Sequence, residues 1–291
     1  MYERHFGFKS KPFALTPDPA FLYLSRKHAM AMTMLEYGLE SGAAFSLLTG
    51  DIGSGKTTLV RRLLRGLGDQ VVVGLISNTH EHFRSIHGWA LAALGIKAAD
   101  DSDIGKYEAL IDSFVRRYSK GQRTLLILDE AQNLSIPVLE ELRLLSNVNS
   151  ETDLLLQVLL VGQPELRVKL SSPELLQFAQ RVSVDFHLRP LDRREAHAYV
   201  RHRLSVAGGD PGLFLPEAID LVYARTQGIP RLLNQLCDFA LVYAFAERRT
   251  RVDAELISEV VRDRSNARLM PAMAKLESNV APLGLTDNGL A

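Results

Sequence analysis

The segment GDIGSGKT, residues 50–57, combines three glycines with a lysine and a threonine. Glycines allow a tight turn in which successive backbone N–H groups point inward at an anion, and a following helix adds its positive N-terminus. The lysine is expected to reach β- and γ-phosphate oxygens, and the threonine hydroxyl to bind Mg²⁺. The spacing therefore predicts a site for ATP with Mg²⁺. The residues expected to line it are Gly50, Asp51, Ile52, Gly53, Ser54, Gly55, Lys56, Thr57 and Thr58.

A second candidate pair, Asp129 and Glu130, ends the apolar run TLLILDE. Parallel α/β sheets place ligand chemistry at the carboxyl ends of their strands. Asp129 is therefore expected to complete the Mg²⁺ shell with Thr57, and Glu130 to polarise the attacking water as general base. The alternative is an acidic pair that caps a helix, which the upstream glycine-rich segment disfavours. Together the two segments predict an enzyme that hydrolyses ATP to ADP and phosphate.

Apolar runs alternate with helical patterns over residues 43–190. Nearly continuous apolar strands indicate burial on both faces of a parallel sheet. The predicted fold class is therefore α/β, a doubly wound parallel sheet of the P-loop type. Strands are expected at 44–50, 71–77, 124–130, 154–162 and 182–188, and helices at 25–41, 56–67, 82–94, 104–119 and 136–148.

The strand pattern stops after Pro190, and helical patterns cover about 192–207, 216–227, 230–247 and 253–264. A small all-helical domain is therefore expected to follow the sheet. The first residues carry aromatic side chains among prolines, which is typical of an extended arm with aromatic anchors. The predicted division is an N-terminal arm and first helix at 1–42, an ATPase core at 43–190, a helical lid at 191–265 and a flexible tail at 266–291.

Composition bounds the partners and the compartment. The 34 basic and 34 acidic side chains cancel, so no global field draws the chain to nucleic acid or anionic lipid. A nucleic-acid partner stays possible but is not favoured. The single cysteine excludes an internal disulfide framework, and no apolar stretch reaches the length of a membrane span. We expect a cytoplasmic protein that can lie at the periphery of the inner membrane through its partners.

The order of these motifs resembles that of AAA+ ATPases over about residues 20–265. The resemblance implies a polar sensor at Gln163 that contacts the γ-phosphate and the lytic water, with a helix cap as the alternative. It implies an arginine finger at Arg181, supplied in trans in a homo-oligomer. The alternative is that Arg181 is an exposed arginine at a helix end. In the lid, GIPRLLNQL implies that Arg231 is a second sensor of the phosphates. The alternative is that Arg231 forms a salt bridge on the surface. Asn78 matches the position at which some relatives hold the catalytic glutamate away from water.

Longer strings resemble the general secretion pathway A (ExeA) group of AAA+ ATPases. They are FGFKSKPFALTPDPAFLYLS, DEAQNL, LEELRLLSN, LVGQPEL and GIPRLLNQLCD. The resemblance implies that ATP turnover drives envelope secretion, pilus or exopolysaccharide assembly, with components of that machinery as partners. Secretion-pathway members carry a membrane span and a peptidoglycan-binding domain after the lid, which residues 266–291 do not supply. The exosortase-associated or pilus-associated relatives are therefore the better match.

Two other functions stay open at this point. A DNA-bound AAA+ regulator of the transposition target-selection type would bind DNA through the ATPase body, although the neutral net charge argues mildly against it. A nucleotide-dependent scaffold would bind ATP with little turnover. A zinc site at His80, His82 and His87 is disfavoured, because the segment offers no cysteine and no well-placed carboxylate to complete it.

Overall fold

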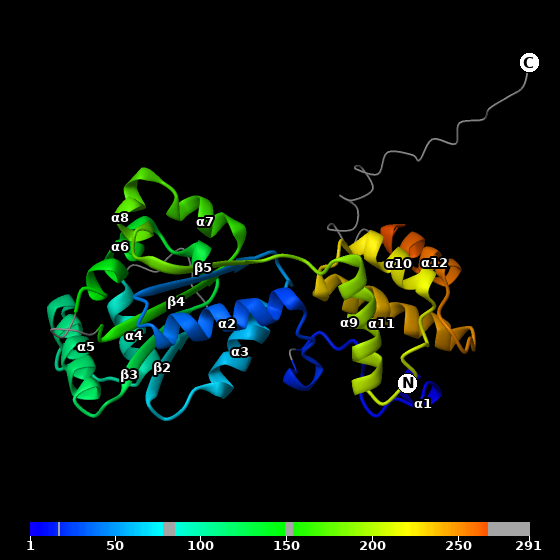
Figure 1. Cartoon of the computed structure of the whole chain (residues 1–291), viewed down its shortest axis with the longest axis horizontal. Coiled ribbons are helices and arrows are strands. Elements are labelled where there is room, and N and C mark those ends of the chain that lie inside the picture. Colours follow the sequence, from blue (N-terminus) through cyan, green and yellow to red (C-terminus); the bar gives the residue numbers. More distant parts are fainter. Residues whose placement is uncertain (17, 78–84, 149–153, 267–291) are drawn as a thin grey trace, which may run out of the picture. The chain divides into compact units, whose positions relative to one another are not determined.

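Five parallel strands form one sheet in the order β2–β3–β4–β1–β5 (Figure 1). The structure is a computed structural model that describes residues 1–16, 18–77, 85–148 and 154–266. The parallel sheet expected from the apolar runs is confirmed, with each strand within two residues of its predicted start and end. The strands are β1 Phe45–Gly50, β2 Val71–Ile76, β3 Arg123–Leu128, β4 Leu156–Gly162 and β5 Val182–Leu188.

The register of the strands brings their carboxyl ends to one edge of the sheet. Leu128 at the end of β3 lies opposite Ile76 in β2 and Leu160 in β4, and Thr49 in β1 lies opposite Gly162 in β4. The loop after β1, the residues after β3 and those after β4 therefore leave the sheet at the same edge. This edge carries the residues for which the sequence predicted chemistry.

Helices cover both faces of the sheet, and successive strand residues divide between the two layers. Leu125 and Ile127 pack with α2 (Arg26–Glu40) and α3 (Lys56–Gly66). Leu126 and Leu128 pack with the helices of the opposite face. Those are α4 Ile86–Leu94, α5 Asp103–Tyr118, α6 Ile136–Leu145, α7 Pro164–Leu170 and α8 Leu176–Ala179. This alternation follows from the two-residue period of a strand, and it explains why β1, β3 and β4 are buried along nearly their whole length and are mostly apolar.

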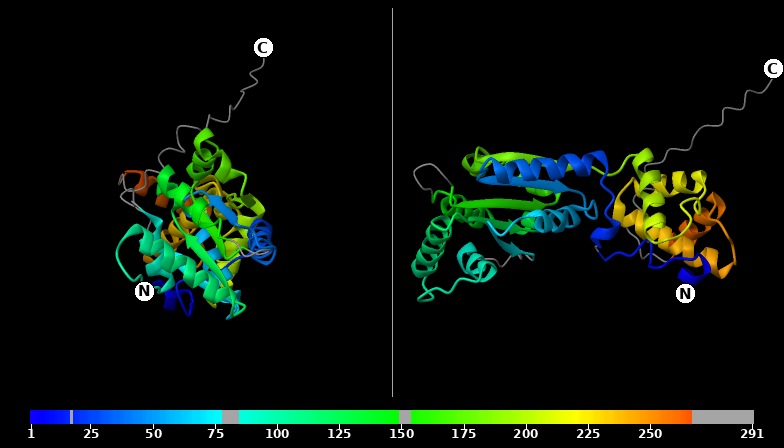
Figure 2. Two further views of the ribbon diagram at one scale, coloured as in Figure 1. Left: turned by 90° about the vertical axis from the view of Figure 1, so that its left-hand side faces the viewer. Right: turned by 60° about the horizontal axis from the view of Figure 1, so that its bottom comes forward.

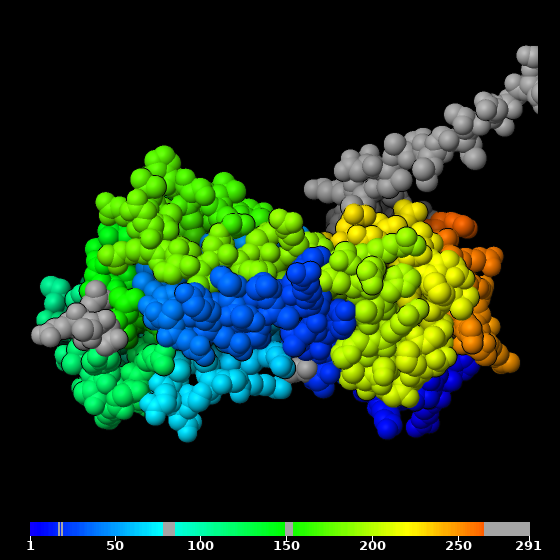
Figure 3. All heavy atoms as spheres, in the orientation of Figure 1, coloured from blue at the N-terminus to red at the C-terminus, as the bar shows by residue number. Residues whose placement is uncertain are grey.

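Helix α2 runs along the sheet beside α3, as the views of Figures 1 and 2 show. Its inner side buries Ala31, Met32 and Leu35. Its outer side, blue in Figure 3, lies on the surface, where Met30 and Tyr37 are at least half exposed. The side chain of Ser25 caps the helix by accepting from the N–H of His28 at 3.3 Å. The first turn of α2 lies near the carboxyl edge of the sheet, where Lys27 Nζ donates to the carbonyl oxygen of Pro190 at 2.8 Å, two residues after β5.

In the second unit, the described residues from Leu191 onward form four helices. They are α9 Arg193–Val206, α10 Pro216–Thr226, α11 Pro230–Ala246 and α12 Ala254–Asn266. Helix α9 starts at a capping box in which Asp192 and Glu195 each bond the backbone N–H of the other. In the described parts of the chain, no helix has both the length and the hydrophobicity that a membrane span requires.

The N-terminal arm belongs to this helical unit, together with the short helix α1 (Tyr2–His5). Phe13 is buried against Phe214, with ring centroids 5.7 Å apart. The guanidinium of Arg203 donates to the carbonyl oxygens of Pro12 at 2.5 Å and Ala14 at 3.1 Å. The segment 1–42, expected as one N-terminal part, is thus divided. Its aromatic anchors are buried in the helical unit, whereas its helix 26–40 covers the sheet.

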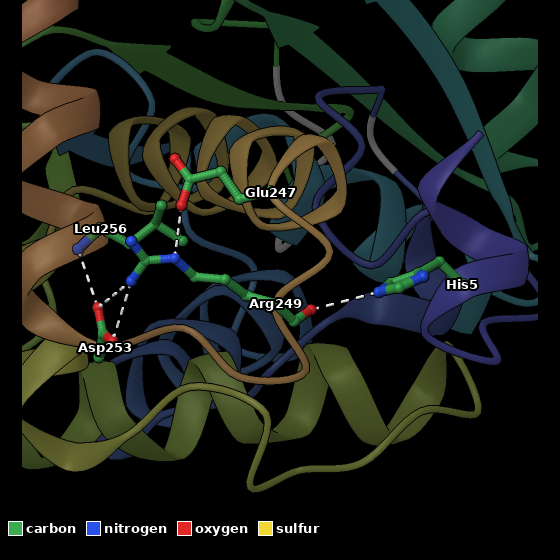
Figure 4. A network of polar contacts seen from close by, with 5 residues as sticks. All are labelled: His5, Glu247, Arg249, Asp253 and Leu256. Atoms are coloured by element: carbon green, nitrogen blue, oxygen red, sulfur yellow. Dashed lines mark hydrogen bonds and ion pairs between the residues drawn. The ribbon is translucent and has the colours of Figure 1, made fainter.

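A polar network secures the other end of the arm (Figure 4). The Nε2 of His5 contacts the carbonyl oxygen of Arg249 at 3.2 Å, so this nitrogen carries the proton and donates. The Arg249 side chain bonds Glu247 at 2.5 Å and Asp253 at 3.2 Å. Asp253 also accepts from the N–H of Leu256 at 2.9 Å, in the first turn of α12. The arm is therefore held by backbone and side-chain contacts at both ends.

Removing the Phe13 ring should destabilise the helical unit. We expect Phe13→Ala to lower the free energy of unfolding by about 3 kcal/mol, because a buried aromatic side chain is replaced by a cavity. Leu15→Ala is the matched control, since Leu15 is 51% exposed and should change stability by less than about 0.5 kcal/mol. Urea unfolding followed by circular dichroism measures both. Equal losses in the two variants would show that the arm is not anchored as described.

Candidate nucleotide-binding site

The glycine-rich loop connects the end of β1 to the start of α3. Gly53 and Gly55 have positive φ angles of 81° and 104°, a region that residues with a Cβ rarely adopt. At Gly50 a Cβ would lie 2.6 Å from the carbonyl oxygen of Leu188 and 2.9 Å from the hydroxyl oxygen of Ser54. The backbone path of the loop therefore requires glycine at all three positions. Gly55 is also the N-cap of α3, so the positive end of the helix opens at the loop.

Lys56 is buried at the base of this loop, with 8% of its surface exposed. Its Nζ donates to the carbonyl oxygens of Gly50 at 2.7 Å and Asp51 at 3.0 Å. Burial lowers the pKa of the ammonium group, and the negative charges of Glu130 and Asp129 oppose that shift. These bonds occupy two of the three N–H groups of Lys56, and the cation lies among carboxylates and backbone oxygens.

Thr57 and Asp129 meet across the edge of the sheet. The Thr57 hydroxyl donates to Asp129 Oδ2 at 3.2 Å. Burial raises the pKa of the Asp129 carboxyl, and the neighbouring Glu130 charge raises it further, while its bonds to Glu130 N–H and Thr57 act in the opposite direction. A hydroxyl beside a carboxylate supplies the hard oxygen ligands that Mg²⁺ prefers. The two residues predicted as metal ligands from the sequence therefore lie together and fit that ion.

Glu130 follows β3 in a left-handed conformation, with a φ of 56° and a ψ of 34°. This conformation costs a non-glycine residue about 1 kcal/mol of conformational free energy, and such positions are frequent at functional sites. The carboxylate oxygen Oε2 accepts from Gln132 Nε2 at 2.7 Å and from Gln163 Nε2 at 3.3 Å. Gln132 Oε1 in turn accepts from the backbone N–H of Gln163 at 3.0 Å. The general base predicted from the sequence is therefore held by two amides.

Gln163 lies at the N-cap of α7, directly after β4, but its side chain makes no capping bond. Gln163 is therefore the N-cap residue by position, as the alternative proposed, but its side-chain amide contacts Glu130. Its contact with the γ-phosphate stays a prediction. Gln132 was missed by the sequence analysis. It lies on the short 3-10 turn Ala131–Asn133, and its nearness to Glu130 in the sequence was the one signal available.

The two arginines predicted to act on the phosphates occupy different places. Arg181 lies between α8 and β5, and its Nη1 donates to Ser146 Oγ at 3.2 Å and to the Arg143 carbonyl at 3.5 Å. It is partly buried, unlike the exposed arginine of the alternative. Arg231 is exposed in the first turn of α11, in the helical unit. Asn78, His80 and His82 lie outside the described residues, as do residues 267–291 of the expected tail.

The sequence analysis also missed His28. This residue of α2 is buried, and its Nε2 lies 3.1 Å from the carbonyl oxygen of Ser54, within the phosphate loop. The Ser54 hydroxyl oxygen is buried and has no hydrogen-bond partner among the described residues. An unpaired hydroxyl within the loop is compatible with a polar ligand, because buried polar groups are normally bonded. The loop, Lys56, Thr57 and Asp129 together therefore fit a triphosphate with its Mg²⁺.

Comparison with known proteins places the chain among similar sequences and folds. Residues 39–170 match the family model described as AAA domain. The chain is 41% identical over 251 residues to general secretion pathway protein A of Aeromonas hydrophila. That match covers 84% of this chain and 45% of the relative, so the chain spans less than half the length of that protein.

Solved structures of low sequence identity share the fold. The ORC2 protein of Aeropyrum pernix, in its ADPNP-ADP complexes, has a TM-score of 0.64 at 19% identity, covering 88% of this chain and 72% of that one. Cdc6p of Pyrobaculum aerophilum has a TM-score of 0.62 at 17% identity, covering 84% of this chain and 70% of that one. RuvB of Thermotoga maritima has a TM-score of 0.52 at 18% identity, covering 83% of this chain and 70% of that one. The chain therefore has the fold of AAA+ P-loop proteins, and it resembles general secretion pathway protein A over 84% of its length.

Proposed function

We propose that this protein hydrolyses ATP with Mg²⁺ and that its turnover serves the assembly of an envelope secretion, pilus or exopolysaccharide machinery. The observation that carries the proposal is the meeting of Thr57, Asp129 and Glu130 at the phosphate loop. The Thr57–Asp129 distance of 3.2 Å joins residues 72 positions apart in the chain. A scaffold that merely bound ATP would not need a carboxylate held beside this site in a strained backbone conformation.

Each residue of the site has a distinct role in this proposal. The loop Gly50–Thr58 offers its backbone N–H groups and the N-terminus of α3 to the phosphates, and Lys56 binds β- and γ-phosphate oxygens. Thr57 and Asp129 would hold the Mg²⁺, which would supply positive charge to the phosphates. Glu130 accepts the proton of the attacking water as the water oxygen bonds to the γ-phosphorus, and the bond from that phosphorus to the β,γ-bridging oxygen breaks to release ADP. The amide donors of Gln132 and Gln163 orient the Glu130 carboxylate for that step.

Two arginines extend the proposal beyond a single site. Arg231 acts as a second sensor of the phosphates, as the resemblance implies. Arg181 acts as a finger on the site of a second copy, so that full activity requires a homo-oligomer. In related chemistry such a finger is worth about 10³–10⁵ in rate. The bonds of Arg181 to Ser146 and to the Arg143 carbonyl are with neutral acceptors, which a phosphate can outcompete.

The biological process rests on similarity to general secretion pathway protein A. We propose that components of an envelope machinery are the partners, and that the protein works on the cytoplasmic side of the inner membrane. The similarity covers 45% of that relative, so the activity of the whole relative is not transferred to this chain.

Removing the base and removing the phosphate ligand should have different effects. We expect Glu130→Gln to bind ATP like the parent and to lose at least about 100-fold in kcat, because the water-activating group alone is changed. Lys56→Ala should lose ATP affinity by about 10-fold or more. Calorimetry measures the ATP affinity of each variant, and phosphate release measures its kcat. Glu36→Gln, an exposed change on α2, is the control. Turnover at the parent rate in Glu130→Gln would contradict the assignment of the base.

The amide clamp on Glu130 predicts a selective effect on chemistry. Gln132→Ala removes the shorter of the two bonds to Oε2 and the acceptor of the Gln163 N–H. We expect kcat to fall about 10-fold with KM changed less than about 2-fold, because orientation of the base is lost while phosphate binding stays. Asn133→Ala, an exposed change next to it, should leave both parameters unchanged. A rise in KM at constant kcat would assign Gln132 to binding instead.

The trans finger can be tested by mixing subunits. Arg181→Ala subunits retain their own Lys56 and Glu130, so they should bind ATP and yet lower the activity of parent subunits mixed with them more than in proportion to their share. Arg167→Ala is the control, because Arg167 forms an exposed ion pair with Asp185 on the neighbouring β5. Activity proportional to the parent fraction, or full activity in isolated monomers, would rule out the finger.

A further inference from the structure

His28 connects the first turn of α2 to the phosphate loop. The ring is buried, with 4% of the residue exposed. Its Nδ1 lies 2.8 Å from Ser25 Oγ and its Nε2 lies 3.1 Å from the Ser54 carbonyl oxygen. Ser25 and Ser54 are 29 positions apart, so the ring joins the cap of one helix to the loop that precedes another.

The partners of the ring fix where its protons lie. A carbonyl oxygen can only accept, so Nε2 carries a hydrogen and donates it to Ser54. In the neutral ring Nδ1 then accepts, and the Ser25 hydroxyl donates to it. The Ser25 oxygen accepts in turn from the backbone N–H of His28 at 3.3 Å. Every donor in this group therefore faces an acceptor, and in the bond to Ser54 the ring is always the donor.

This bond acts on one peptide plane of the loop. In a trans peptide the C=O of one residue and the N–H of the next point in opposite directions. Drawing the Ser54 carbonyl toward His28 therefore directs the N–H of Gly55 away from α2. The ring also lies close to Gly55, where a Cβ would come within 3.1 Å of Nε2. His28 thus limits both the tilt of the plane and its approach to the helix.

We propose that His28 is a positioning residue for phosphate binding, which orients the Ser54–Gly55 peptide so that the Gly55 N–H is preset toward the anion. The inference rests on the proposed nucleotide site and deepens it. The competing interpretation is a buried histidine that merely stabilises α2 against the sheet. The two differ in what they predict for the folded protein, because packing affects stability whereas a preset donor affects affinity.

Three substitutions in the full chain separate the interpretations. His28→Leu removes both ring nitrogens at similar volume. In His28→Gln the amide nitrogen lies near the place of Nε2 and can still donate to Ser54. In His28→Asn the shorter side chain reaches Ser25 but not Ser54. Leu35→Val is the control, because it perturbs the packing of buried α2 without touching the loop.

The measurements are the Kd of Mg²⁺-ATP by calorimetry, kcat and KM from phosphate release, and the unfolding midpoint in urea without nucleotide. We expect Kd and KM to rise about 10-fold in His28→Leu and His28→Asn, with kcat at saturation within about 2-fold, since one hydrogen bond is lost. His28→Gln should recover most of the affinity. Leu35→Val should lose stability at unchanged Kd.

Parent-like Kd in His28→Asn, or equal Kd in the Asn and Gln variants, overturns the inference. The Asn and Gln pair decides the question even where His28→Leu does not fold. Absence of ATP binding by the parent chain would instead refute the proposed function, and the role of His28 with it. The two failures are therefore distinguished by the parent measurement alone.

Discussion

The placement of a buried cation among carboxylates at one edge of a parallel sheet is the constraint on which the site depends. The ammonium group of Lys56 is held by the Gly50 and Asp51 carbonyl oxygens, with Glu130 and Asp129 near enough to oppose the effect of burial on its pKa. A charge so far removed from water is tolerated because it is bonded and balanced. The loop, the end of β3 and α3 must therefore keep their relative positions.

The general base is constrained differently. Glu130 adopts a left-handed backbone conformation, and its carboxylate accepts from Gln132 and Gln163. The first feature costs free energy, and the second offsets part of that cost through charge-assisted hydrogen bonds. Because Gln163 follows β4 and Gln132 lies on the turn after β3, the carboxylate is oriented by two neighbouring strands.

The helical unit shows that chain order does not determine where a segment packs. The arm precedes α2 in sequence, yet it packs with α9 and the residues around Phe214. Apolar burial is non-directional, so aromatic anchors indicate that a segment packs without indicating where. The decisive contacts are the two carbonyl oxygens of the arm that bind the Arg203 guanidinium.

The sequence by itself determined the class of fold and the identity of the residues around the phosphate loop. Alternation of apolar runs with helical patterns predicted five parallel strands, because burial on both faces leaves a continuous apolar signature. The spacing of Gly50, Gly53 and Gly55 before Lys56 predicted an anion loop, because the backbone conformation requires glycine there. The apolar pattern of a strand and the glycine spacing of a loop are properties of short segments, so the order of residues within a segment is sufficient to show them.

Only the tertiary structure decided which distant groups meet. The meeting of Asp129 and Thr57 was predicted from the motifs, but the contact of Gln163 with Glu130 follows from the order β2–β3–β4–β1–β5, and no local pattern encodes strand order. The same holds for Gln132 and for His28, whose side chains acquire a role from what lies opposite them. Hydrogen bonds between segments far apart in the chain depend on angles and distances that the packing of the sheet sets, and residue type alone does not specify them.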